Sequence, residues 1–128
     1  MSAFEMDPVA FEGPKPVDGY GPTGFRIGGE WFEGAVLVTA EGARRVDVSA
    51  PMLGLEAAPP EGIDLLLLGM GPEVAHPDPA LRAWLEARDI SPEPMASPAA
   101  ARTFNVLVAE GRTVGALLLP IGEVEAPA

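Results

Sequence analysis

The chain has no cysteine, one histidine and one lysine, so several kinds of chemistry are excluded at the start. Without thiols it forms no disulfide, no cysteine-ligated zinc or iron–sulfur centre and no cysteine nucleophile. His76 has no second histidine to help it hold a metal, and a usual metal site needs several convergent ligands. We therefore predict no metal site and no cofactor, and interpret His76 as a loop residue near the start of a helix.

Positive charge is scarce as well. The chain carries 19 acidic against 8 basic residues, for a net charge of −11, and its longest basic run is Arg44-Arg45. Nucleic acids and anionic membrane surfaces are bound through clustered lysine and arginine. The sequence thus predicts an acidic protein with no nucleic-acid partner.

Long apolar runs are also missing. No run of hydrophobic residues is longer than Leu65–Leu68, which Ile63 precedes across Asp64, whereas a helix that crosses a bilayer needs roughly 20 apolar residues. The N-terminus shows neither the basic-then-apolar pattern of a secretory signal nor an arginine-rich presequence. We expect no direct membrane insertion and a cytoplasmic location.

What remains is typical of one folded domain. The chain has 128 residues, of which 48% are hydrophobic and 21% charged, and both values suit a single globular core. Prolines are frequent in residues 1–23, which predicts an extended N-terminal arm that either lies along the domain or hangs free. We assign residues 24–121 to a single α/β domain and residues 122–128 to a mobile acidic tail.

The first part of the domain is predicted to form two β-hairpins. Gly28-Gly29 separates two short strand candidates within residues 24–33, and glycine tolerates the positive φ that a two-residue hairpin turn requires. Residues 35–48 form the second hairpin, which turns at Glu41-Gly42. Alternation along its return strand places two valines inward, Val46 and Val48.

The second part alternates strands and helices. Ile63–Leu68 is apolar apart from Asp64, as expected of a central strand covered on both faces. Asp78-Pro79 and Ser97-Pro98 each combine a capping residue with a first-turn proline, so a helix is predicted after each pair. Residues 90–95 form an edge strand that tolerates its two prolines. Together with a last strand after Gly111, this order predicts a mixed sheet with parallel members.

A pocket is expected at the carboxyl end of the central strand, where ligands of open α/β sheets tend to bind. Gly69 and Gly71 resemble the start of a dinucleotide-binding turn, but Pro72 follows and a third glycine is absent, so a tight turn is favoured. Thr103 and Asn105 are mediocre helix formers. They either bond to a neighbouring loop or face this crevice, and the four residues form the candidate ligand pocket.

Two further features bear on function. No serine, threonine or carboxylate has a base partner at recognisable spacing, so no catalytic residue is predicted.

On a strand only one of Trp31 and Phe32 can face inward. If the other is exposed beside Phe25, the aromatic patch would be a protein-binding surface, since aromatic residues are enriched at interfaces. The interface candidates are Phe25, Trp31 and Phe32.

Several segments, taken as an ordered set, resemble one known family. The segments are Gly24–Ile27, Gly69 with Gly71, Thr103–Asn105, Glu110–Arg112 and Gly115–Leu117. The set resembles the small α/β proteins that include a mitochondrial respiratory complex I assembly factor, the adipogenesis-associated domain protein of animals and many bacterial and archaeal proteins of unknown function. The resemblance implies a three-layer fold around a central mixed sheet and brings no catalytic residues. The presequence of the mitochondrial members is not found in this chain.

The hypotheses for function are therefore as follows. The first is a non-enzymatic protein-interaction domain, with an assembly role in a membrane respiratory complex implied by the resemblance. The second is a small-ligand-binding protein or enzyme that uses the crevice at the end of the central strand. The third is a homo-oligomer joined through the aromatic hairpin.

Overall fold

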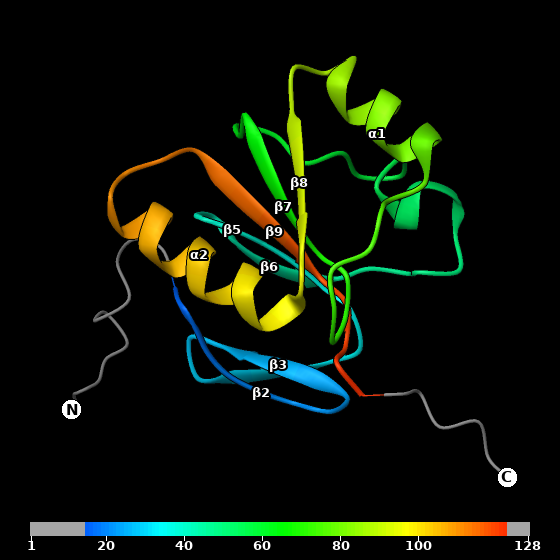
Figure 1. The fold of residues 1–128 in the computed structure, drawn as a ribbon. Coiled ribbons are helices and arrows are strands. Elements are labelled where there is room, and N and C mark those ends of the chain that lie inside the picture. Colours follow the sequence, from blue (N-terminus) through cyan, green and yellow to red (C-terminus); the bar gives the residue numbers. More distant parts are fainter. Residues whose placement is uncertain (1–14, 123–128) are drawn as a thin grey trace, which may run out of the picture.

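Five strands form the central layer in the computed structural model, which describes residues 15–122 (Figure 1). Their order across the sheet is β6-β5-β9-β7-β8. The strands are β5 (Val36–Thr39), β6 (Gly42–Arg45), β7 (Leu65–Gly69), β8 (Ser91–Met95) and β9 (Val114–Leu118). β7 is parallel to both β8 and β9, whereas β5 is antiparallel to both β9 and β6. The predicted mixed sheet is confirmed, and β8 lies at its edge.

A second, smaller sheet packs beneath the first in the view of Figure 1. Its antiparallel strands are β2 (Val17–Gly21), β3 (Gly24–Ile27) and β4 (Glu30–Glu33). The predicted turn is present between β3 and β4, where Gly28 and Gly29 have φ angles of 58° and 86°. β2 falls within the predicted arm, but it pairs with β3 and buries Val17, so it belongs to the fold. Residues 1–14 of that arm, and residues 123–128 of the predicted tail, lie outside the described residues.

The leucine run is a strand covered on both faces, as predicted. Leu67 packs into the core on one side of the sheet, and Leu66 and Leu68 pack into the core on the other. The strand is not central, however, because β9 occupies the middle of the sheet. The chain returns from β8 past β7 and pairs along the opposite edge of β7.

Two helices complete the domain. α1 (Pro79–Glu86) begins as predicted, because the Asp78 carboxylate accepts a hydrogen bond from the Ala80 N–H and caps the helix. α2 (Ser97–Ala109) begins one residue before the predicted position: Ala96 occupies the cap position and Ser97 is the first helical residue. The prediction that Ser97 caps this helix is therefore wrong, because its side chain turns into the protein interior.

The sheet separates two apolar cores and so gives the protein three layers. On one face, α2 and the small sheet meet around Phe104 and Phe25. On the other face, α1 and the loop before β7 meet around Leu85 and Leu55. Alternation along each strand sends successive side chains to opposite cores. The predicted three-layer α/β fold is confirmed.

The loop that follows β6 differs from the predicted strand. β6 ends at Arg45, Val46 is half-buried, and Val48 is 51% exposed, so the inward position predicted for Val48 is wrong. Strand alternation stops where strand pairing stops, and the chain continues into a short 3-10 helix, η2 (Pro51–Gly54). Within residues 15–122 no helix has the length and apolar character needed to cross a membrane.

Candidate functional site

The glycine pair at the end of β7 packs against α2 and leaves no crevice on that side. A Cβ atom on Gly69 would lie 2.9 Å from the Cα of Ser97, which is itself fully buried. The Ser97 hydroxyl accepts a hydrogen bond from the Gly71 N–H at 2.9 Å and donates one to the Leu119 carbonyl at 2.6 Å. This side chain joins the segments that follow β7 and β9. The sequence pattern does not reveal this role, because a serine before proline is typical of a helix cap.

The other two residues predicted for this pocket lie further along α2. Asn105 bonds to both backbone groups of Val17: its Oδ1 accepts from the Val17 N–H and its Nδ2 donates to the Val17 carbonyl, each at 2.9 Å. Thr103 is half-buried on the same helix. At 1.5 Å rise per residue, Thr103 and Asn105 are about 9 and 12 Å from Ser97 along the axis. The fold does not gather the four predicted residues around one opening, and Asn105 fastens β2 to α2.

Asn105→Asp is expected to lower the free energy of unfolding by about 1 to 2 kcal/mol at neutral pH. The carboxylate still accepts from the Val17 N–H, but it has no proton to donate to the Val17 carbonyl and repels it. Urea denaturation measures the loss. Val106→Ala, an exposed change on the same helix, should cost under about 0.5 kcal/mol. An equally small loss for Asn105→Asp would show that the paired bonds do not hold β2.

A hollow of about 360 Å³ opens on the opposite face of the sheet, beyond the carboxyl ends of β7 and β9. Its lining is apolar except for one carboxylate. The lining residues are Val48, Ala50, Met52, Leu53, Met70, Pro77, Asp78, Leu81 and Leu119. Met70 and Leu119 directly follow the two strands. A pocket is thus present at the predicted end of the sheet, but on the α1 side and with other residues.

The outer wall of this hollow has an unusual backbone. Met52 and Leu53 have φ angles of 57° and 53°, in the left-handed region that side chains with a Cβ rarely occupy. In the same loop the Ser49 hydroxyl and N–H both donate to Asp47, at 2.6 and 2.9 Å. Both hydrogen bonds hold the pKa of Asp47 below its ordinary value, and the bond from the hydroxyl has the larger effect. The loop that contains this wall therefore carries an ionised carboxylate at neutral pH, outside the lining itself.

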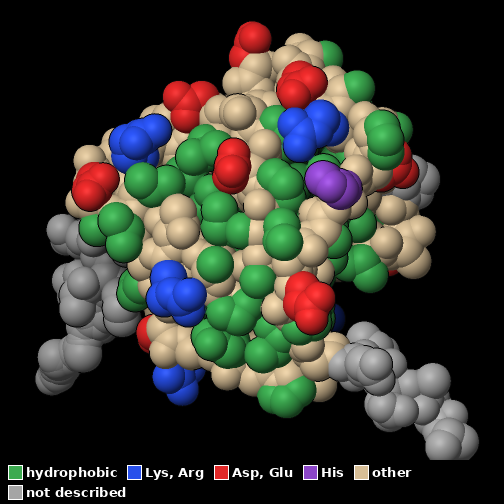
Figure 2. Space-filling view, in the orientation of Figure 1, with side chains coloured by type: hydrophobic (Ala, Val, Ile, Leu, Met, Phe, Trp, Pro, Cys, Tyr) green, Lys and Arg blue, Asp and Glu red, His purple; other side chains and the backbone are tan. Residues whose placement is uncertain are grey.

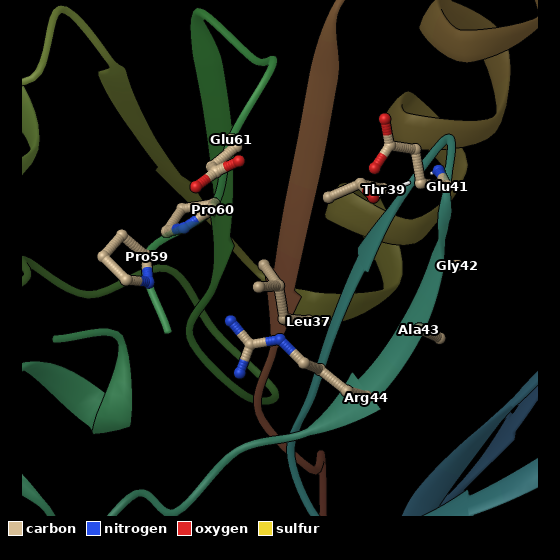
Figure 3. Close-up of a pocket in the computed structure, with 9 residues that line it drawn as sticks. All are labelled: Leu37, Thr39, Glu41, Gly42, Ala43, Arg44, Pro59, Pro60 and Glu61. Atoms are coloured by element: carbon tan, nitrogen blue, oxygen red, sulfur yellow. Dashed lines mark hydrogen bonds between the residues drawn. The ribbon is translucent and has the colours of Figure 1, made fainter. Parts of the chain in front are cut away.

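A second hollow, of about 340 Å³, lies between β6 and the loop before β7. Figure 3 shows the Arg44 side chain reaching from β6 toward Pro59 and Pro60, with Glu61 beyond them. The guanidinium donates to the backbone carbonyl of Ala58. The lining of this second hollow also includes Glu41. The charges here are mixed, and its single cation already bonds to the protein, so this hollow does not form an anion site.

The outer face of the small sheet carries one exposed aromatic residue, Trp31. Phe25 is completely buried and Phe32 is half-buried against the same core, so neither joins Trp31 at the surface. Trp31 is 47% exposed. Its ring lies against Gly24, where an added Cβ would come within 2.9 Å of the ring. The indole N–H donates to the Glu33 carboxylate at 2.8 Å, so the ring is held in one orientation.

Trp31→Phe is expected to raise the pKa of the Glu33 carboxyl. Hydrogen bonds from Trp31 first and then from Thr23 lower this pKa in the native protein, because they favour the carboxylate. The stabilisation from Glu33 is therefore complete above the ordinary carboxyl range and is lost as pH falls through the lowered pKa. Carbon NMR titration of the Glu33 carboxyl measures the change. Tyr20→Phe, which leaves both donors in place, should not move this pKa.

In the described part of the chain, ionisable residues do not gather into a metal site. Among residues 15–122 no group of three or more His, Cys, Asp or Glu side chains is placed to hold a metal ion. His76 is exposed in the loop before α1. On the face shown in Figure 2, the basic side chains are spread singly among acidic and apolar ones. That face has no basic patch of the kind that binds nucleic acid.

Comparison with known proteins assigns the chain to a family. Residues 17–119 match the family described as a protein of unknown function, DUF498/DUF598. The chain belongs to the DUF498/DUF598 family. It is also 45% identical, over 111 residues, to an uncharacterized protein of Rhodobacter capsulatus, a match that covers 87% of this chain and 89% of that protein.

Solved structures similar to this DUF498/DUF598 domain have the same fold. A protein described as an outer membrane protein of Bartonella henselae is 34% identical, with a TM-score of 0.70 over 84% of this chain and 96% of that one. A Bordetella parapertussis protein is 31% identical, with a TM-score of 0.74 over 86% and 98%. A Bordetella pertussis protein described as a Mth938-like domain is 25% identical, with a TM-score of 0.69 over 96% and 94%.

Proposed function

We propose that the chain is a non-enzymatic protein-interaction domain and that a protein partner binds the outer face of the small sheet at Trp31. The observation that carries this proposal is an exposed tryptophan held in place by its own sheet. The hydrogen bond to Glu33 and the close contact with Gly24 restrict the ring before any partner binds. A restricted aromatic side chain offers a large contact area at little further cost in entropy, and tryptophan is enriched among residues that dominate binding energy.

The test is capture of partners from a native lysate of the organism that encodes the chain. The unchanged protein is expected to retain at least one stable protein partner, and Trp31→Ala is expected to lose it. Val106→Ala removes an exposed apolar side chain from α2 and should retain the same partner. No stable partner for the unchanged protein, or identical partners for all three proteins, would overturn the proposal.

An assembly role in a membrane respiratory complex is the process we propose for this interaction, on the basis of the family resemblance. Deleting the gene is expected to reduce the amount of assembled respiratory complex I on native gels, together with its activity. The unchanged gene should restore both, and the Trp31→Ala form should not. Normal assembly without the gene would defeat this role, while the capture experiment would still decide whether a protein partner binds.

Two further points are part of the proposal. The partner is a different protein. If a second copy of the chain bound at Trp31 instead, light scattering would show a dimer for the unchanged protein and a monomer for Trp31→Ala. The location is the cytoplasm, which fractionation of the native organism tests. Recovery of the protein with the outer membrane would contradict this location.

The alternative is a small-ligand-binding protein or enzyme that uses the hollow beyond β7 and β9. Its position favours this reading, since ligands bind at the carboxyl ends of strands in open α/β sheets. Its lining does not favour catalysis, because its one ionisable residue, Asp78, already caps α1 and has no base or acid partner among the lining residues.

A further inference from the structure

The hollow beyond β7 and β9 lies where the chain leaves two neighbouring strands in opposite directions. After β7 the chain passes to α1, on the face of the sheet that Leu66 and Leu68 cover. After β9 it passes to the small sheet on the other face, where the Gly122 N–H donates to the Pro22 carbonyl at 2.8 Å. Strands whose following segments diverge in this way leave a crevice between them. The opening is thus a consequence of the topology.

The chemistry of the lining selects an apolar group. Met70 and Leu119 form the floor, and the side chain of Leu81 forms part of the α1 wall. Methionine adapts to irregular apolar shapes and recurs at surfaces that bind apolar side chains. Polar small molecules are oriented by several placed donors and acceptors, whereas here the only charged lining group, Asp78, already accepts from the Ala80 N–H. Aliphatic side chains fit this lining better than a polar metabolite does.

The charge around the hollow selects a basic neighbour for that apolar group. The two loops that wall it, residues 46–56 and 70–79, contain no lysine or arginine. Their carboxylates are Asp47, Glu56, Glu73 and Asp78. These acidic loops attract segments of the opposite sign and repel anionic ligands such as fatty acids. Arg82, next to the lining residue Leu81 on α1, is paired with Glu86.

The backbone of the outer wall gives independent support. Met52 and Leu53, both on the lining, adopt left-handed φ angles. Such a conformation is strained, and outliers of this kind cluster at functional sites, ligand-binding loops among them. The wall therefore presents its apolar side chains at a cost that the fold elsewhere offsets.

We propose that this hollow docks an amphipathic basic segment of a protein partner, with its aliphatic side chains between Met70 and Leu81 and a lysine or arginine beside Asp78. The site is independent of the Trp31 surface. The two surfaces lie on opposite sides of the five-stranded sheet, because the small sheet packs on one face and α1 on the other.

The test uses the full-length chain labelled with nitrogen-15 and three synthetic peptides with blocked ends. The first places leucine at helical spacing among lysines, the second replaces each lysine by glutamate, and the third replaces each leucine by serine. The leucine–lysine peptide is expected to shift the amide signals of Met70, Leu81 and Leu119 at the lowest concentration, and the serine peptide is expected to leave them unchanged. At low salt it should bind about tenfold more tightly than the glutamate peptide, and added salt should reduce the difference.

Three variants separate docking at this hollow from general attraction to an acidic protein. Ala50→Trp fills the hollow and should abolish binding, whereas Ala57→Trp, an exposed change in the same loop, should leave it intact. Asp78→Asn removes one charge but keeps a good helix cap. It should weaken the leucine–lysine peptide about threefold and leave the melting temperature unchanged. This variant decides the matter if Ala50→Trp does not fold.

Several results would overturn the proposal. These are no binding of the leucine–lysine peptide at millimolar concentration, equal binding of the lysine and glutamate peptides, or signal changes around Trp31 in place of Met70 and Leu119. Saturation of the hollow by 1-octanol without any peptide binding would point to a small apolar ligand and would overturn it as well. Trp31→Ala should leave peptide binding unchanged, so failure here and failure of the proposed function are distinguishable.

Discussion

Phe104→Ala is expected to lower the free energy of unfolding by about 3 to 5 kcal/mol. The ring is completely buried in the core where α2 meets both sheets, and it shares that core with Phe25 of β3 and Val36 of β5. Removing it loses the transfer free energy of the ring and leaves a cavity that three layers must close together. Denaturant titration followed by circular dichroism measures the loss.

The control for this change is Val106→Ala, two residues along the same helix. Val106 is exposed, so the same shortening to alanine should cost under about 0.5 kcal/mol. If Phe104→Ala also cost less than about 1 kcal/mol, the small sheet and α2 would not be packed around this ring as described.

Ser97→Ala is expected to cost about 1 to 3 kcal/mol and to free the segment after β7. The substitution leaves the buried Gly71 N–H without the hydroxyl that accepts its hydrogen bond, and the Leu119 carbonyl loses its donor. A buried polar group without a partner costs its full desolvation. The hydrogen-exchange rate of the Gly71 amide should rise, which distinguishes this loss from a general loss of stability.

Ser91→Ala serves as the matched control, because Ser91 is exposed at the start of β8. It should change neither the unfolding free energy by more than about 0.5 kcal/mol nor the exchange of Gly71. Unchanged exchange in the Ser97→Ala protein would show that the hydroxyl does not bridge the two segments.

Ser97 also bears on the proposed docking site. The two segments that Ser97 joins contain Met70 and Leu119, which form the floor of the hollow on the other face of the sheet. The hydrogen bonds of Ser97 therefore fix the positions of both floor residues from the opposite face of the sheet. The hollow lies on one face of the sheet at this strand end, and on the other face the close packing of Ser97 against Gly69 fills the position of the predicted crevice.

Local features of the sequence predicted the elements well, because their causes lie within a few residues. Gly28-Gly29 supplies the positive φ angles of the hairpin, and Asp78-Pro79 supplies both the cap and the first turn of α1. The leucine run predicted a strand with two covered faces, since a strand without polar side chains has no face suited to solvent. β2 was missed because its glycines and neighbouring prolines give no strand signal without the partner strand.

The candidate sites depended on contacts that no local pattern contains. Trp31 and Phe32 were predicted to face opposite ways, yet nothing in their spacing decides which one faces water. Asn105 was placed either at a crevice or against a neighbouring segment, and its partner, Val17, is 88 residues away. The lining of the hollow likewise comes from three distant parts of the chain.

The sequence by itself determined the acidic character, the strands and helices other than β2, and the mixed α/β class, because charge, periodicity and turn residues act locally. The tertiary structure alone decided that β9 lies in the middle, that Ser97 fills the position of the predicted crevice, that Trp31 faces outward and that an apolar hollow opens beside α1. Each of these follows from which distant segments pack against one another, and packing is a property of the whole fold.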